Sequence, residues 1–362
     1  MDISQFVGAF GGIAWTAASF IVALLVIVAV HEYGHYIIGR LSGIHAEVFS
    51  LGFGPKLMSR VDRHGTRWQI ALLPFGGYVK FLGDADASSR RDESGLAGLT
   101  PDERRHSMHG APLWARSATV IAGPLFNILL TLLLFFGTIL YTGVALDQPV
   151  IGALRPVPYA QDELKVGDQI LSLNGSPTPD LTTYFTVADK LGPLPAVSYE
   201  VKRGDQTLTV DGPHPLPPVA AAVYPESAAL DAGLQTGDVI LKAAGQPIAT
   251  FSQLPDLIEA TGGAPIALTI WRAGKTFDLT LSPRRRDLPT ADGGFETRWL
   301  IGLSGGMLFD PAMREPNLAE AAELSWNQTW YMAKTTLSGL GHIVSGAISS
   351  CNISGPVGMA KV

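Results

Sequence analysis

Residues 13–35 read IAWTAASFIVALLVIVAVHEYGH, and most of the architecture can be worked out from this stretch. The eighteen residues from Ile13 to Val30 are mostly apolar, and no charged residue occurs between Ile3 and Val30. A run of this length predicts a helix that spans a bilayer. Ionisable side chains at membrane depth cost free energy, so the cluster that ends the run indicates a function.

That cluster is the sequence His-Glu-Tyr-Gly-His at residues 31–35. Two histidines four residues apart on a helix share one face. His31 and His35 can therefore ligate one zinc ion, and Glu32 can take a proton from the attacking water. The alternative is that these side chains are helix-end groups at the membrane interface. The apolar run before them favours the metal site.

Composition agrees with a chain that lies partly in lipid. The 362 residues allow two or three domains. Charged residues make up only 16% of them and apolar residues 47%. The net charge of −6 gives no basic footprint, so no nucleic-acid partner is predicted. Cys351 is the only cysteine, which excludes internal disulfides and a cysteine-based zinc site.

A second apolar run predicts a second span over residues 113–144, after a first span over residues 1–39. Gly123-Pro124 suggests a kink or a helix start within it. Residues 1–39 carry no lysine or arginine, whereas residues 40–116 carry eleven. The loop over residues 40–112 is therefore predicted to be cytoplasmic, with His31, Glu32 and His35 toward that side.

The loop itself contains three stretches of extended character, at residues 46–51, 66–73 and 78–82, separated by glycines and prolines. They predict a small sheet associated with the membrane surface. Residues 84–110 are polar and charged, which predicts a mobile loop.

An internal repeat follows the second span. KVGDQILSLNG at residues 165–175 matches QTGDVILKAAG at residues 235–245, and each copy is followed by a predicted helix and a hairpin. We expect two small domains, over residues 145–213 and 214–286. Residues 287–349 are expected to be an irregular linker and then an amphipathic helix, lying on the outer membrane surface or packed on the repeats. Residues 350–362 would start a further membrane segment.

The two copies resemble PDZ domains, the second through PESAA at residues 225–229 and AGL at residues 232–234. PDZ domains bind extended peptides by strand addition. The alternative is a pair of packing domains, so a peptide ligand stays open.

Taken together, the pattern resembles the site-2 protease family over essentially the whole chain. The matching pieces are HEYGH at residues 31–35, FGGYVK at 75–80, GPLFN at 123–127 and ISGPVGMAK at 353–361. The resemblance implies a multi-span α-helical membrane protein with a membrane-associated β-hairpin region and two extramembrane tandem PDZ domains of α+β type. It implies a bacterial inner-membrane location, with the PDZ domains on the periplasmic side.

The same resemblance implies intramembrane proteolysis with zinc as cofactor, His31 and His35 as metal ligands and Glu32 as the catalytic residue. Substrates would be single-span membrane proteins already trimmed by another protease, such as anti-sigma factors, or remnant signal peptides. Membrane lipid is the other implied partner. The PDZ pair would exclude substrates with bulky outer domains.

Substrate contacts are expected in two places. The resemblance implies a strand that pairs with substrate, formed by Gly76, Gly77, Tyr78, Val79 and Lys80. Asn127 near the start of the second span is expected to hydrogen-bond substrate or the reaction intermediate. The alternative for Asn127 is a helix-packing amide.

One departure from the family concerns the third zinc ligand, an aspartate within a Leu-Asp-Gly motif. The chain contains no such motif, and its nearest string is Leu230-Asp231-Ala232 in the second repeat. His45 and His64 are chemically suitable but have no supporting spacing. The third ligand is expected in a segment after Val362. The competing interpretation is a membrane-anchored PDZ scaffold that binds exported polypeptides without catalysis, which leaves the histidines without a role.

Overall fold

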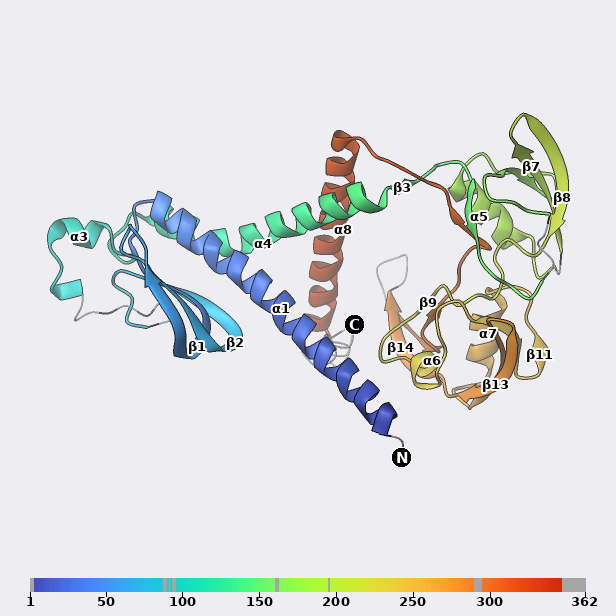
Figure 1. The fold of residues 1–362 in the computed structure, drawn as a ribbon, viewed down its shortest axis with the longest axis horizontal. Helices are drawn as coiled ribbons and strands as arrows, with labels where there is room; N and C mark the ends of the chain where they lie inside the picture. Colours follow the sequence, from blue (N-terminus) through green and yellow to red (C-terminus); the bar gives the residue numbers. More distant parts are fainter. Residues whose placement is uncertain are drawn as a thin grey trace. The chain divides into compact units, whose positions relative to one another are not determined.

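The computed structural model describes residues 3–86, 90, 92, 96–159, 163–194, 196–289 and 295–346. The chain divides into two units (Figure 1). One unit comprises residues up to Thr138 together with Ala319–Ala333, and the other comprises Ile139–Leu318 together with the residues from Lys334 onward. The predicted segment 350–362, with Cys351 and the motif at residues 353–361, lies outside the described residues.

Two long apolar helices form the frame of the first unit: α1 (Ile3–Leu41) and α4 (Leu113–Thr142). Both are long and apolar enough to cross a membrane, and only 11% of the most apolar window of α4 is buried. Such exposed apolar surface suits lipid rather than the core of a soluble domain. The two predicted helices are therefore confirmed, although Pro124 lies inside α4 and does not begin it.

The two helices pack closely where their side chains are smallest. A Cβ built at Gly34 of α1 would lie 2.6 Å from the backbone oxygen of Ala122 in α4. Only glycine allows that approach. This crossing holds the residues around His31 and His35 against α4.

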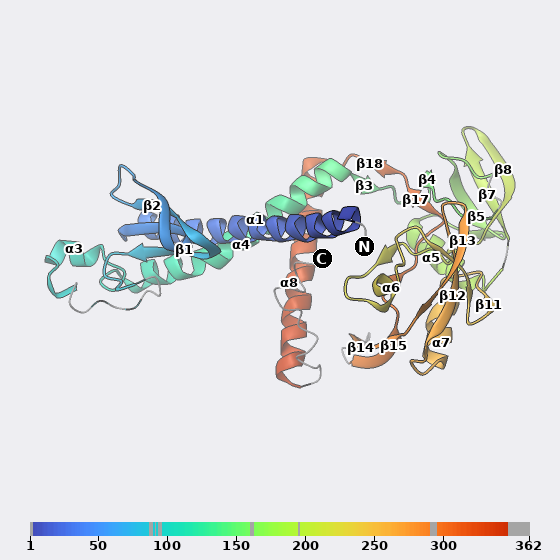
Figure 2. The ribbon, with the colours of Figure 1, turned by 60° about the horizontal axis from the view of Figure 1, so that its bottom comes forward.

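An antiparallel pair of strands, β1 (Ala46–Val61) and β2 (Arg67–Phe81), lies beside α1 (Figure 2). Val48 pairs with both Lys80 and Arg67, so the start of β1 lies between the two ends of β2. The sequence predicted three short stretches, but the structure has two long bent strands. Gly52 has a φ of 86°, a conformation that favours glycine and lets β1 bend without ending.

The predicted mobile loop over residues 84–110 contains ordered structure in its described part. Helix α3 (Pro101–Arg105) starts with a capping box between Thr100 and Glu103. Asp84 is buried and accepts a hydrogen bond from the backbone N–H of Phe81. The polar composition of the loop did not reveal these local hydrogen bonds.

The second unit contains the internal repeat as two sheets of the same design. The first repeat consists of β4 (Ile151–Leu154), β5 (Gln169–Leu173), β6 (Ser176–Pro177), α5 (Leu181–Lys190), β7 (Val197–Arg203) and β8 (Gln206–Gly212). The second consists of β9 (Ala222–Val223), α6 (Ala228–Asp231), β10 (Val239–Ala243), β11 (Gln246–Pro247), α7 (Gln253–Ala260), β12 (Ile266–Arg272) and β13 (Lys275–Leu281). Their sheet orders, β6-β5-β7-β8 and β11-β10-β12-β13, are equivalent.

Each repeat is fixed by one buried ion pair. In the first repeat the fully buried carboxylate of Asp168 accepts hydrogen bonds from Arg203 at 2.7 Å and from the backbone N–H of Lys165. Burial alone would raise the pKa of Asp168, but these hydrogen bonds outweigh it and hold that pKa below its usual value. Asp238 and Arg272 repeat the arrangement in the second copy.

The segment after residue 283 was predicted to be irregular, and this prediction is wrong. It forms the hairpin β14 (Arg284–Pro289) and β15 (Phe295–Leu300), then β16 (Leu303–Ser304), β17 (Phe309–Pro311) and β18 (Met313–Arg314). Strand β16 pairs with β9, β17 with β4, and β18 with β3 (Val144–Ala145). Phe309 is buried, with its ring 5.6 Å from that of Tyr184 in α5. The predicted ranges 145–213 and 214–286 therefore omit strands that complete both repeats.

Helix α8 (Leu318–Val344) follows where an amphipathic helix was predicted. Ala321, Ser325 and Thr329 are buried and lie four residues apart, on one face. Trp326 and Trp330 are exposed. Its contact with the outer membrane surface stays a prediction.

Candidate metal centre and active site

The two histidines of the motif lie one turn apart on α1, with their rings edge to face. Their Nε2 atoms are 3.2 Å apart and the ring planes make an angle of 82°. Two nitrogen ligands of one tetrahedral zinc ion lie about 3.3 Å apart, given Zn–N distances of about 2.0 to 2.1 Å. His31 and His35 therefore fit two positions of a zinc site.

A glycine of α4 lets both imidazoles lie against the backbone of that helix. A Cβ built at Gly123 would overlap Nε2 of His35 and would lie 2.7 Å from Nε2 of His31. Any other residue at this position would push the two rings from their places. The paired donor atoms, held in this way, fit two positions of a metal site.

Helix α4 also orients both rings. The Nδ1 atom of His35 lies 2.7 Å from the backbone oxygen of Thr119, so Nδ1–H donates and Nε2 keeps its lone pair for a metal. The Nδ1 atom of His31 lies 3.2 Å from Nδ2 of Asn127. The structure thus places Asn127 beside a candidate metal ligand.

Strand β2 brings its backbone close to Glu32, the carboxylate of the motif. A Cβ at Gly77 would lie 3.2 Å from Cγ of Glu32, and the backbone N–H of Val79 donates a hydrogen bond to Glu32. Of the other residues expected at substrate, Tyr78 stacks on Phe53 and Lys80 pairs with Glu47 at 2.9 Å. Gly76, with a φ of 126°, lies just before this contact.

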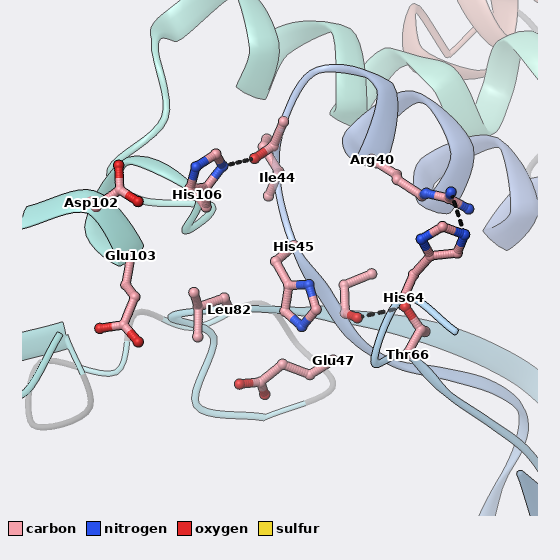
Figure 3. A pocket seen from close by; sticks show the side chains of 12 residues that line it. Arg40, Ile44, His45, Glu47, His64, Thr66, Leu82, Asp102, Glu103 and His106 are labelled. Atoms are coloured by element: carbon pink, nitrogen blue, oxygen red, sulfur yellow. Dashed lines mark hydrogen bonds between the residues drawn. The ribbon is translucent and has the colours of Figure 1, made fainter. Parts of the chain in front are cut away.

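The other histidines considered as ligands lie elsewhere. His45 and His64 line a pocket of about 580 Å³ at the end of α1, with Glu47 and His106 (Figure 3). Arg40 donates to Nε2 of His64 at 2.7 Å. Among the described residues no three His, Cys, Asp or Glu side chains are grouped closely enough to hold a metal ion. The third ligand is therefore not found in the described part of the chain.

The two histidines and the glutamate of the motif lie on a helix that is long enough to span a membrane, and a second such helix packs against them. This arrangement is typical of a membrane-embedded metalloprotease site. Comparison with known proteins agrees. The family model of peptidase family M50 matches residues 19–361. The chain belongs to peptidase family M50, the site-2 protease family, and is therefore a zinc metalloprotease.

Individual relatives are similar over most of their length. The chain is 32% identical to the regulator of sigma-E protease RseP of Salmonella typhimurium, over 96% of this chain and 81% of that protein. It is 30% identical to RseP of Escherichia coli, over 96% and 80%. It is also 30% identical to a putative zinc metalloprotease of Agrobacterium fabrum, over 94% and 73%. These matches confirm the family expected from the sequence.

Sequence reasoning missed two parts of the site. The close packing of both rings on Gly123 and the hydrogen bond to the carbonyl of Thr119 were not predicted, because both depend on how α4 crosses α1. The only signal for Gly123 was a glycine inside an apolar span, which permits close helix contact.

Proposed function

We propose that the chain cleaves peptide bonds within the membrane, with His31 and His35 as zinc ligands and Glu32 as the catalytic base. The observation that supports this most is the pair of Nε2 atoms, 3.2 Å apart, that lie against Gly123 of α4. Zinc, when bound, polarises the scissile carbonyl and makes water more acidic. Glu32 takes the proton of the attacking water and returns it to the leaving amine.

A catalytic zinc site takes three protein ligands and leaves one position open. We propose that an aspartate outside the described residues is the third ligand. The substrates are proposed to be single-span membrane proteins already trimmed outside the membrane, such as anti-sigma factors, or remnant signal peptides. The similarity to RseP proteins, which are named regulator of sigma-E protease, supports this substrate class. The proposed location is a bacterial inner membrane, with the metal site toward the cytoplasm and the repeats outside.

Strand β2 is proposed to hold the substrate in an extended form. A helical peptide bond has its carbonyl engaged in the helix, so the substrate must unwind before it is cut. An exposed strand edge can pair with such an unwound segment. The contacts of Gly77 and Val79 with Glu32 support this role, because they place the strand next to the catalytic carboxylate.

Val79→Pro is expected to lower kcat/KM for a membrane-embedded reporter by about tenfold or more, since each 1.4 kcal/mol of lost pairing costs tenfold. The proline removes the N–H beside Glu32 and leaves the metal ligands in place. Val79→Ala is the matched control, because it also shortens the side chain but keeps the N–H. Equal cleavage by both variants, at equal zinc content, would argue against pairing at this edge.

The two repeats are proposed to be PDZ domains that exclude substrates with bulky outer domains. Their equivalent sheets and identical Asp–Arg pairs support a common α+β design. Whether an extended peptide binds them is part of the same proposal, and the mode would be strand addition.

Asp168→Asn is expected to weaken exclusion by the first repeat. Removing the charge of Asp168 leaves the guanidinium of Arg203 without its ion-pair partner and destabilises the repeat. Cleavage of a reporter that carries a folded outer domain should rise, while cleavage of a trimmed reporter stays constant. Asp211→Asn, at an exposed site in the same repeat, is the control. If limited proteolysis shows that the repeat has opened and the ratio of the two cleavage rates is unchanged, the repeat does not filter substrates.

The alternative function is a membrane-anchored PDZ scaffold without catalysis. It accounts for the repeats but not for the paired Nε2 atoms of His31 and His35. Zinc content separates the two functions, because a scaffold has no need of bound metal at His31 and His35.

A further inference from the structure

We infer that Asn127 is a positioning residue for the metal ligand His31, whose Nδ1–H its side-chain oxygen accepts when zinc is bound. This inference rests on the proposed zinc site and replaces the expected contact between Asn127 and substrate. It concerns which side-chain atom of Asn127 faces the imidazole.

The described arrangement forms a continuous chain of hydrogen bonds. Asn127 Nδ2 donates to Nδ1 of His31 at 3.2 Å, which leaves the ring proton of His31 on Nε2. That Nε2–H points to Nε2 of His35 at 3.2 Å. Nδ1–H of His35 in turn donates to the backbone oxygen of Thr119 at 2.7 Å. The side-chain oxygen of Asn127 is buried and has no hydrogen-bond partner in this arrangement.

A metal shared by the two histidines requires the other orientation. An ion held by both Nε2 atoms needs a lone pair on each of them. His31 must then carry its proton on Nδ1, and an amide nitrogen cannot accept that proton. A rotation of the Asn127 amide by about half a turn brings Oδ1 to Nδ1–H and gives the buried oxygen its missing partner.

Asn127 is well placed for this role because it lies on α4 one turn after Gly123, on the same face of the helix. Gly123 lets the two rings lie against α4, and Asn127 provides the acceptor that fixes the ring of His31. An acceptor of this kind typically changes metal affinity by about 10- to 100-fold.

The test is the zinc affinity of the full-length protein in detergent, measured by competition with a chromophoric chelator. Asn127→Leu, which has similar size and no acceptor, is expected to bind zinc about 10 to 100 times more weakly. Asn127→Asp is expected to bind at least as tightly as the parent, because both carboxylate oxygens accept. Ile128→Leu, at an exposed position of the same helix, is the control and should change nothing. The visible spectrum of bound cobalt(II) reports the ligand geometry independently of catalysis.

Unchanged zinc affinity and an unchanged cobalt spectrum in Asn127→Leu, with a raised KM, would overturn the inference in favour of a substrate contact. An equal loss of affinity in Asn127→Asp would overturn it as well, since that variant keeps an oxygen acceptor. If the proposed zinc site itself is wrong, the result is different: His31→Ala would then bind zinc as tightly as the parent.

Discussion

Glu32→Gln is expected to abolish cleavage of a membrane-embedded reporter while zinc stays bound. Glutamine has nearly the same shape as glutamate but cannot take a proton from water. General acid–base catalysis contributes about 10²- to 10⁴-fold, so kcat should fall by that factor. The measurement compares the cleavage rate and the zinc content of the purified full-length protein.

Glu47→Gln is the matched control for this variant. Glu47 is also a partly buried glutamate of the same unit, but it pairs with Lys80 and lines the separate pocket at the end of α1. Its replacement should leave the cleavage rate close to that of the parent. Cleavage by Glu32→Gln at the parental rate would remove Glu32 from the mechanism.

Gly123→Ala is expected to cause near-complete loss of zinc and, with it, of cleavage. The added methyl group would overlap Nε2 of His35 and crowd Nε2 of His31. The effect should exceed the about 10- to 100-fold weakening that is typical of residues behind the ligands, because the methyl displaces the two ligand rings themselves. Metal analysis of the purified protein measures it.

Gly137→Ala in the same helix is the control, since a Cβ there meets nothing within 4 Å. Both changes raise helix propensity, by up to about 1 kcal/mol, so the difference between them reports the steric effect alone. Equal zinc content in the two variants would show that the metal lies elsewhere.

Local sequence predicted that His31 and His35 lie together, because a spacing of four residues on one helix fixes their common face. It did not predict the role of Gly123. That role depends on the approach of two helices about 90 residues apart in the chain, which no local pattern encodes. Gly123-Pro124 suggested a kink or a helix start, but α4 begins at Leu113 and continues through Pro124.

The prediction from sequence missed the strands β16, β17 and β18 for a different reason. Periodicity identifies a strand only over about four to eight residues, and these strands contain two or three. Their partners β9, β4 and β3 lie far back in the chain. The pairing is set by tertiary packing, such as the burial of Phe309, and not by local preference.

The pairing of β17 with β4 has a consequence for biosynthesis. Arg155 and Asp310, which form an ion pair beside these strands, are 155 residues apart. A ribosome that adds about 5 to 20 residues per second needs roughly 8 to 30 s to cover that stretch. During this interval the edge of β4 is open to other polypeptides. The nascent chain therefore depends on chaperones or on rapid export until its late strand arrives.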